Sequence, residues 1–531
     1  MGARKREPKR ELSKDFALRH LPYVLGILAI ATALAHFRTQ IDSNDEGIAA
    51  MGAWRVLRGE IPYRDFFAVE TPLSFYLVAP LYALFGVSFT VGRVVAQFLG
   101  LGIVICVFQL VRRWIPSPLF AALPLAFLCQ AGVGVFPFAS HHWFADLFCL
   151  IAVVAADRAL ASQGKLGWWL AGAAGALALS SLQDQGALML LGLAAVAAFV
   201  PEPGSRRLAL GRLLGGAVVA ALPLALAVIP RAGLAAMWRD LVAFPWTGYR
   251  ATQGNDLGFL QPFSELAGQW TSGAWRHAPL FTAGATVTSV ALIVTPLAAP
   301  FLALWTWRRR KAPLAIVALL LAATIAFLLT AAHRWAPINL QWAAAPPAIA
   351  LAFWLHRERE AAPRRRWPTA VALVLILAFG VFGVGRIREA ADRGLWFAVD
   401  SPAGRTRVPS RAIGQQIQEM IAVVGQRVPA TDPLVVYGWP TWGFATLRVS
   451  PLRWDVFAPP AFPPGSLSHD AIAEVEAKKA PWIVTPPFEQ PGPAERDEWK
   501  VYLTSHYTLE WANAGWGLFR RTVAERGAGP K

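Results

Sequence analysis

The sequence predicts an all-α polytopic membrane protein of about eleven transmembrane helices, followed by a small α/β domain. Of its 531 residues, 55% are hydrophobic and 16% are charged, and the apolar residues form long blocks. Several blocks reach the roughly 20 residues that a helix needs to cross the hydrocarbon. Short basic clusters between the blocks account for the formal charge of +17, so nucleic acid is not an expected partner.

The first expected crossing follows a basic N-terminal segment, residues 1–20. The apolar run Leu21–Phe37 is too long for a signal peptide, and no small-residue cleavage site follows it. We therefore expect a cytoplasmic N-terminus in the plasma (inner) membrane. The chain then emerges near Phe37, which places residues 38–86 in an outer loop.

The apolar segment Pro72–Gly86 is expected to lie in the outer membrane interface as a short helix. About 15 residues at ~1.5 Å each reach only ~22 Å, which is less than a ~30 Å hydrocarbon core. Counting Pro72–Gly86 as a crossing would also place Arg112 and Arg113 outside. Without it, every basic cluster is cytoplasmic; the clusters are Arg112–Arg113, Arg158 with Lys165, Arg206–Arg207, Arg308–Lys311 and Arg357 through Arg366.

The polytopic domain is expected to span residues 21–386, and its sixth crossing is short. The expected crossings are Leu21–Phe37, Val91–Val111, Pro118–Phe138, Trp143–Leu160, Leu166–Leu182, Ala187–Val200, Leu213–Ile229, Leu280–Trp305, Pro313–Ala332, Ile338–Leu355 and Trp367–Val384. An odd number of crossings places whatever follows outside the cell.

Residues 387–531 are expected to form a soluble extracytoplasmic α/β domain, because Pro and charged residues return there and apolar runs become short. Asn513-Ala514-Gly515 is typical of a hairpin turn. The expected helices are Pro409–Arg427 and Ala471–Lys479, and the expected strands are Pro433–Tyr437, Trp482–Thr485, Tyr507–Trp511 and Trp516–Arg520.

The outer loop carries the densest group of acids, at Asp42, Asp45, Glu46, Asp65 and Glu70. One interpretation is a solvated loop whose acids stabilise helix starts, with Asp45 and Glu46 at the first turn of a helix over Ile48–Leu57. The other is an acid cluster that removes a proton from an acceptor hydroxyl or amine, or holds a metal ion, at the membrane surface.

Several spaced motifs favour the second interpretation. They are Asp45-Glu46, the segment from Gly59 through Phe66, Glu70 with Pro72-Leu73, Phe85-Gly86, and Arg93. Together they resemble the opening of GT-C class membrane glycosyltransferases, in the branch that contains protein O-mannosyltransferases and lipid A aminoarabinose transferases. The resemblance covers the membrane region and, more loosely, the C-terminal domain.

The resemblance implies inverting transfer of a sugar from a polyprenyl-phosphate donor to a glycolipid, polysaccharide or protein acceptor on the outer face. By this resemblance Asp45 is the expected general base. Glu46 and Glu70 would orient the substrate or, with His142, hold a divalent metal ion. Arg64 and Asp65 are expected substrate contacts.

Two further outward turns carry candidate residues. Ser140-His141-His142 and Asp146 form the first, and His141, His142 and Asp146 are expected to bind substrate, although a histidine at a helix end is also an ordinary interfacial residue. The second turn, Gln183-Asp184-Gln185, lacks the lysine that many relatives place there.

A phosphate partner is therefore expected elsewhere, at Arg250, His333 or Arg334. A guanidinium suits this role because its planar donors bind two oxygens together. Contact with lipid headgroups is the competing interpretation for each arginine in the outer loop.

Two other functions describe a chain of this composition. A transporter or lipid flippase would be expected to show two similar halves and midplane acids, whereas this sequence has no visible repeat and its acids lie at outer turns. A surface polysaccharide polymerase or ligase would depend on the large outer loop and its arginines. No Gly-rich nucleotide fingerprint is visible, which favours a lipid-linked donor.

Overall fold

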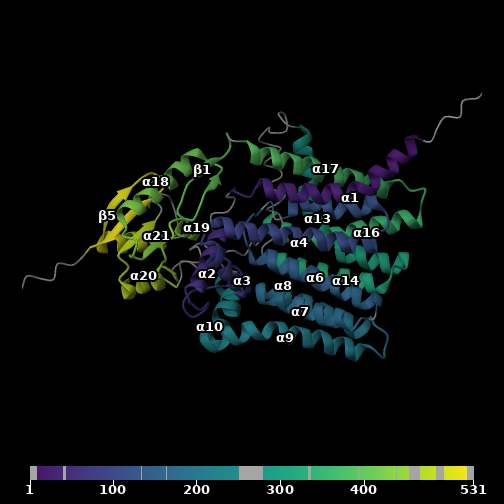
Figure 1. Ribbon diagram of the computed structural model, residues 1–531, viewed down its shortest axis with the longest axis horizontal. Helices are drawn as coiled ribbons and strands as arrows, with labels where there is room; N and C mark the ends of the chain where they lie inside the picture. Colours follow the sequence, from purple (N-terminus) through teal and green to yellow (C-terminus); the bar gives the residue numbers. More distant parts are fainter. Residues whose placement is uncertain are drawn as a thin grey trace, which may run out of the picture.

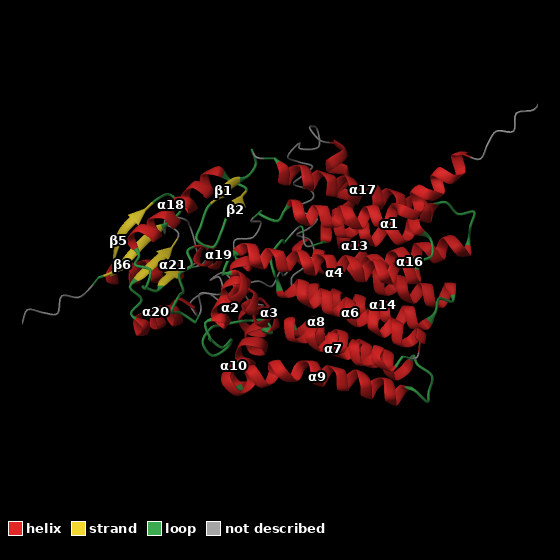
Figure 2. Cartoon of the chain, in the orientation of Figure 1, coloured by secondary structure: helices red, strands yellow, loops and turns green. Residues whose placement is uncertain are grey.

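The computed structural model describes residues 9–522, except 40–43, 133, 135, 163, 250–278, 333–336, 393, 438, 454–466 and 486–494. Long helices lie side by side in a bundle, and a smaller domain containing the strands covers one end of it (Figures 1 and 2). Helix α1 (Lys9–Ala35) begins at the opposite end (Figure 1). We call the covered end the outer end, after the topology expected from the sequence, and the other end the far end.

Each expected crossing corresponds to a helical region in the bundle. The helices are α1, α4 (Phe89–Trp114), α5 (Pro118–Ala131), α6 (His141–Ser162), α7 (Lys165–Ser181), α8 (Gln183–Phe199), α9 (Arg206–Ala232), α13 (Pro279–Arg310), α14 (Leu314–Ala332), α16 (Ala345–Ala361) and α17 (Trp367–Ala391). Within the described residues, six helices are individually long and apolar enough to cross a membrane: α1, α4, α9, α13, α14 and α17. Eleven crossings remain a prediction.

Two expected helix boundaries were wrong. The helix expected over Pro118–Phe138 ends at Ala131, where Gly132 begins a glycine-rich segment that disfavours a helix. The helix expected over Ile338–Leu355 is divided into α15 (Pro337–Trp342) and α16. Pro346 and Pro347 explain the division, because proline fits the first turn of a helix and disrupts its interior.

Two short helices from the outer loop lie at the outer end of the bundle (Figure 1). They are α2 (Asp45–Leu57) and α3 (Leu73–Phe85). Helix α3 has 13 residues, so at about 1.5 Å per residue it is shorter than the hydrocarbon core. Its position in the membrane interface remains a prediction. After α9 the chain continues through α10 (Leu234–Trp238) and two π-helical segments, η1 (Arg239–Ala243) and η2 (Pro245–Tyr249).

The C-terminal domain contains a four-stranded sheet in the order β3-β4-β6-β5. Strands β3 and β4 are parallel, whereas β6 is antiparallel to both β4 and β5. A separate hairpin joins β1 and β2. The strands are β1 (Phe397–Val399), β2 (Thr406–Val408), β3 (Leu434–Val436), β4 (Trp482–Thr485), β5 (Tyr507–Ala512) and β6 (Gly517–Arg521).

The expected secondary structure of this domain is confirmed in outline. Helices α18 (Arg411–Arg427) and α20 (Leu467–Lys478) lie where helices were expected. The Asn513 side chain accepts hydrogen bonds from Gly515 N and Trp516 N and so closes the expected hairpin turn. Two helices were not expected, α19 (Pro440–Ala445) and α21 (Glu495–His506).

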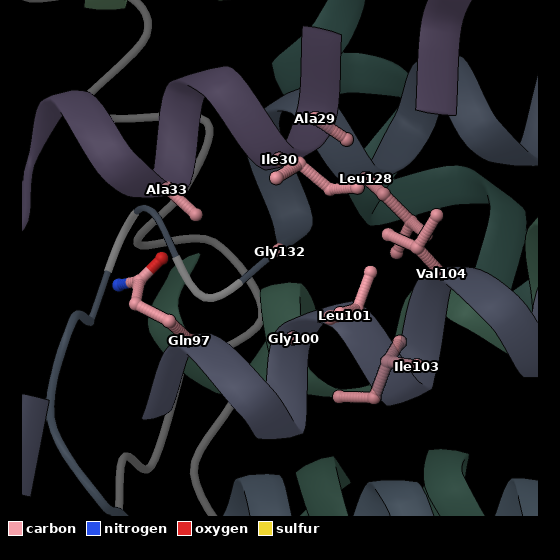
Figure 3. Close-up of a pocket in the computed structure, with 10 residues that line it drawn as sticks. All are labelled: Ala29, Ile30, Ala33, Gln97, Gly100, Leu101, Ile103, Val104, Leu128 and Gly132. Atoms are coloured by element: carbon pink, nitrogen blue, oxygen red, sulfur yellow. The ribbon is translucent and has the colours of Figure 1, made fainter. Parts of the chain in front are cut away.

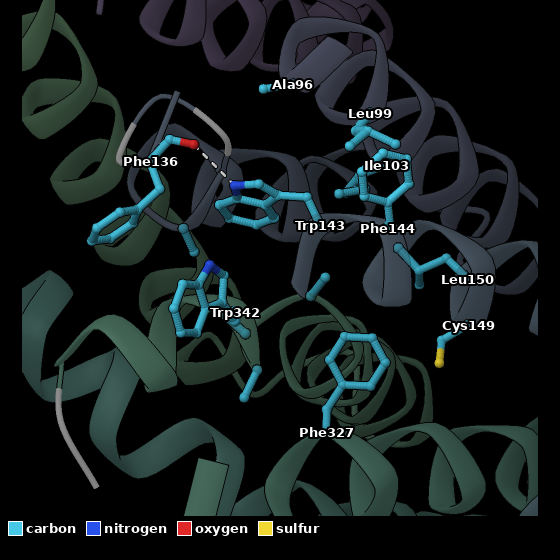
Figure 4. Packing of buried hydrophobic residues seen from close by; sticks show 14 of the residues in the cluster. Ala96, Leu99, Ile103, Phe136, Trp143, Phe144, Cys149, Leu150, Phe327 and Trp342 are labelled. Carbon is cyan, nitrogen blue, oxygen red and sulfur yellow. Dashed lines mark hydrogen bonds between the residues drawn. The ribbon is translucent and has the colours of Figure 1, made fainter. Parts of the chain in front are cut away.

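The bundle core combines large aromatic rings with closely packed small residues. Trp143 is almost fully buried, and its indole N–H donates to Phe136 O over 3.0 Å (Figure 4). Helices α7 and α9 pack so closely that a Cβ at Gly172 would lie 1.8 Å from Leu213 O. Small residues at such contacts allow helix backbones to approach each other in a membrane.

Candidate active site at the outer end of the bundle

The first turn of α2 presents the two acids that the sequence placed there. Asp45 and Glu46 are its first residues, where the unpaired amides of a helix N-terminus favour negative charge. Gly47 N donates to Thr441 Oγ1 over 2.9 Å, and a Cβ at Gly47 would lie 2.0 Å from Thr441 N. This close contact presses the start of α2 against α19 of the C-terminal domain.

Glu46 is buried in an ion pair with Arg93 of α4. The Glu46 Oε1 and Oε2 atoms lie 2.7 and 2.9 Å from Arg93 Nε and Nη2. Arg93 Nη2 also donates to Thr406 Oγ1 over 2.8 Å, so the pair joins α2, α4 and β2. Both oxygens of Glu46 are engaged. Asp45 is half-buried, and the helical geometry turns it about 100° away from Glu46.

Arg64 and Asp65, which the sequence suggested as substrate contacts, bind each other in a turn. Their shortest contact is 2.7 Å, and Asp65 Oδ2 also accepts from Ile61 N over 2.7 Å. The Arg64 hydrogen bond is the main cause that lowers the pKa of Asp65. These contacts give Asp65 a role in the turn, and substrate contact by either residue remains a prediction.

Tyr63, in the same turn, has an unusual backbone conformation. Its φ of 70° is left-handed, which costs an ordinary L-residue roughly 1–2 kcal/mol. Tyr63 N donates to Phe66 O, and the buried Tyr63 hydroxyl donates to Glu70 O, both over 2.8 Å. Burial raises the pKa of Tyr63, so this hydroxyl remains a donor. The turn therefore fixes the backbone at Glu70.

Glu70 differs from Glu46 in its side-chain partners. It is buried, and its Oε1 makes no hydrogen bond within the described part of the chain. That oxygen lies 3.6 Å from His141 Nδ1. Gln183 fixes the neighbouring backbone by donating to Val69 O and accepting from Thr71 N. The structure therefore brings Glu70, His141 and the turn at residue 183 together.

His142 and Asp146 have partners deeper in the bundle. The His142 ring stacks on Trp342 with centroids 3.6 Å apart, and Asp146 Oδ1 accepts from Gln185 Nε2 over 2.7 Å. His142, Gln185 and Trp342 line a small pocket together with Phe327, Thr330, Ala331, Asn339 and Ala343. Figure 4 shows Trp342 and Phe327 from this region.

Among the described residues, the expected site residues make separate pairwise contacts. The pairs are Glu46 with Arg93, Glu70 with His141, and Asp146 with Gln185. A single cavity shared by Asp45, Glu70 and His141 remains a prediction. Arg250, His333 and Arg334 lie outside the described residues. Sequence reasoning missed residues that support the loop from a distance, which are Thr406, Thr441 and Arg453. It named the turn at Gln183 but not the contacts of Gln183 with the backbone beside Glu70.

The described residues do not assemble a metal centre. They contain no group of three or more His, Cys, Asp or Glu side chains arranged to hold an ion. The three expected ligands are divided among different partners, since Glu46 is bound to a guanidinium and His142 stacks on an indole.

A second pocket is apolar and lies between α1, α4 and α5 (Figure 3). Gln97 is its one strongly polar lining residue, and it follows Arg93 by one turn of α4. Such a lining suits hydrocarbon better than a sugar. The remaining lining residues are Ala29, Ile30, Ala33, Gly100, Leu101, Ile103, Val104, Leu128 and Gly132.

No family model and no curated protein match the sequence. Solved structures do match the fold. ArnT from Cupriavidus metallidurans in the apo state has a TM-score of 0.56 and 14% identity, over 95% of this chain and 99% of that one. The oligosaccharyltransferase of Archaeoglobus fulgidus in complex with Zn and sulfate has a TM-score of 0.53 and 12% identity, over 88% and 68%. Its apo form has a TM-score of 0.51 and 13% identity, over 96% and 75%.

Both similar proteins are GT-C glycosyltransferases. The chain therefore has the GT-C fold, and the resemblance that the outer-loop motifs carry is confirmed at the level of the fold. At these identities the likeness concerns architecture, and activity has to be argued from the site.

Proposed function

We propose that the chain is a membrane glycosyltransferase that moves a sugar from a polyprenyl-phosphate donor to a cell-envelope acceptor. The acceptor is a glycolipid, polysaccharide or protein on the outer face of the plasma (inner) membrane. A GT-C fold and an acidic turn at the end of the bundle that meets the C-terminal domain support this proposal. A helical bundle with apolar outer faces suits a donor whose carrier stays in the lipid.

The proposal rests mainly on two neighbouring acids in the first turn of α2, Asp45 and Glu46, which have different surroundings. Glu46 has both oxygens in a buried ion pair, so it anchors the turn. We assign the general-base role to Asp45, the half-buried acid beside Glu46 in the same turn. This assignment narrows the sequence-based one, which gave Glu46 a direct part in orienting the substrate.

The reaction is a single displacement. Asp45 takes the proton of the acceptor hydroxyl or amine while that atom attacks the anomeric carbon from the face opposite the phosphate. The bond between the anomeric carbon and the phosphate oxygen breaks, and polyprenyl phosphate leaves with the electron pair. The configuration at the anomeric carbon is inverted. Glu70 and His141, 3.6 Å apart, orient the substrate through a carboxylate oxygen that makes no hydrogen bond within the described chain.

The donor phosphate is expected to meet Arg334, His333 or Arg250, which lie outside the described residues. Arg334→Ala should weaken donor binding, because it removes a charge-assisted contact to phosphate. The change should raise the Kd for undecaprenyl phosphate, measured with the purified chain. An unchanged Kd would remove Arg334 from the donor site.

The direct test uses the purified chain in lipid nanodiscs, a panel of undecaprenyl-phosphate-linked sugars and an extract of cell-envelope acceptors. Asp45→Asn should lower transfer on the order of 10²- to 10⁴-fold and leave donor binding intact, because the amide keeps the shape and loses the proton acceptor. Asp400→Asn is the matched control, since Asp400 lies in an exposed ion pair with Arg405.

Transfer by Asp45→Asn at the unmodified rate would contradict this mechanism. If that variant stayed active while Arg250→Ala lost activity, the polysaccharide polymerase or ligase would replace the proposal. Sugar-lipid movement across the bilayer without transfer would indicate a flippase.

A further inference from the structure

One arginine of the C-terminal domain lies where three segments, far apart in sequence, meet. Arg453 contacts the turn at Tyr63 and the buried carboxylate of Asp240 in η1. We propose that Arg453 is a positioning residue that, with Asp240 as its counter-ion, holds the turn at residues 63–67 and thereby Glu70 in place for transfer. The activity part of this inference rests on the proposed function, whereas the structural part does not.

Arg453 binds the turn with both its side chain and its backbone. Its Nη2 donates to Tyr63 O over 3.0 Å, and its own carbonyl accepts from Phe67 N over 2.8 Å. Its guanidinium also lies 5.9 Å from the centre of the Phe67 ring. Arg453 therefore holds both ends of a turn whose first residue, Tyr63, adopts the left-handed conformation that needs support from its surroundings.

Asp240 supplies the charge that keeps Arg453 in this position. Its side chain is only 1% exposed, and one oxygen accepts from Arg453 Nη2 while the other accepts from Arg239 Nε over 2.9 Å. Burial lowers the pKa of Arg453 and raises that of Asp240, and each charge offsets the cost of burying the other. The segment of Asp240 also packs on the turn directly, because the Phe244 and Phe67 rings meet edge to face at 4.9 Å.

The contacts of Arg453 connect to Glu70 through Tyr63. The Tyr63 carbonyl accepts a hydrogen bond from Arg453 Nη2, and the Tyr63 hydroxyl donates one to Glu70 O over 2.8 Å. Glu70 in turn lies beside His141. Arg453 acts on Glu70 only through this turn, so a change at Arg453 should disturb the geometry of the transition state more than donor binding.

The first experiment measures hydrogen exchange in the full-length chain in nanodiscs, without substrate. Arg453→Gln should speed exchange in peptides covering residues 61–70, and Arg453→Lys should restore part of the protection because it keeps a charge beside Asp240. Arg521→Gln is the matched control, since Arg521 pairs with Glu476 inside the C-terminal domain. Exchange in Arg453→Gln equal to that in the unmodified chain would overturn the inference.

The second experiment measures transfer from undecaprenyl-phosphate-linked sugars. Arg453→Gln should lower kcat on the order of 10- to 100-fold and change the donor KM far less, with partial rescue by Arg453→Lys. Asp240→Asn with Arg453→Gln should cost no more than Arg453→Gln alone, because both act through one contact. Equal losses in Arg453→Gln and Arg521→Gln would show a general loss of folding and overturn the positioning role. If the unmodified chain transfers no sugar, the proposed function fails, while the exchange experiment still decides the structural claim.

Discussion

Buried carboxylates occur at both ends of the helical bundle, and their partners differ. At the far end, Asp157 accepts from the Trp114 indole over 2.9 Å and pairs with Arg113 at 2.6 Å. Glu358 likewise accepts from the Trp305 indole and pairs with Arg310. At the outer end, Glu70 Oε1 lies 3.6 Å from His141 Nδ1 and makes no hydrogen bond in the described chain.

The difference distinguishes acids that stabilise the fold from an acid that can bind a substrate hydroxyl. A buried carboxylate whose two oxygens already contact an indole and a guanidinium has its charge and its buried oxygens satisfied within the fold. A buried carboxylate oxygen without a donor carries a cost that a substrate hydroxyl can remove. Glu46 belongs with the structural acids because Arg93 binds both of its oxygens, although it lies at the outer end.

Thiol labelling should differ most clearly between the two ends of the bundle, because only one of them faces outward. We expect Ser505→Cys in the C-terminal domain to react with an impermeant thiol reagent in intact cells, and Ser162→Cys at the far end to react only after the membrane is opened. The native cysteines, Cys106, Cys129 and Cys149, are buried and should give little background. The reverse labelling pattern would place the proposed site in the cytoplasm.

The next prediction sets the two kinds of acid against each other. Glu70→Gln should lower transfer on the order of 10²-fold with little change in thermal stability, because it removes an acceptor whose oxygen supports no internal hydrogen bond. Asp157→Asn should do the opposite and cost about 1–3 kcal/mol of stability while transfer persists. Transfer assays and melting curves on both variants check the contrast, which fails if the two variants behave alike.

Glu46→Gln tests the assignment of Glu46 to the structural acids. The change leaves the buried Arg93 guanidinium without its counter-charge, and breaking a buried pair costs roughly 3–5 kcal/mol. We expect a strongly lowered melting temperature together with lost activity. A Glu46→Gln protein that melts normally and fails only in transfer would return Glu46 to the reacting groups.

The smallest effect is expected at Asp65, whose contacts are partly exposed. Its folded pKa lies below the usual value near 3.9, so its contribution is present above that pH and is lost as the pH falls through the folded pKa. Hydrogen exchange at residues 61–65 should therefore stay constant between pH 7 and pH 5, after correction for the intrinsic rate. A loss of protection already near pH 6 would indicate a different titrating group.

Hydropathy and local turn chemistry predicted the elements well because both are short-range properties. The apolar blocks predicted where the bundle helices lie, and Asn513 predicted the hairpin turn. Helix α19 was missed because six residues carry too little periodicity to be recognised. The break before α16 was open to prediction, since Pro346-Pro347 marks a helix start.

The positions of Asp45, Glu46 and Glu70 in the outer loop could be predicted, whereas their roles remain predictions. The outer-loop motifs suggested these three acids, and α2 does begin at Asp45. The sequence could not show that Glu46 pairs with Arg93, 47 positions later. Nor could it show that Gly47 contacts Thr441, 394 positions later. Such pairs depend on the packing of whole domains, which no local pattern encodes.

A cryo-EM structure of the chain in nanodiscs with undecaprenyl phosphate would test the proposed site most directly. We expect phosphate density at the outer end, near the start of α2 and the pair formed by Glu70 and His141. Phosphate density only at the far end, beside Arg310, would contradict it.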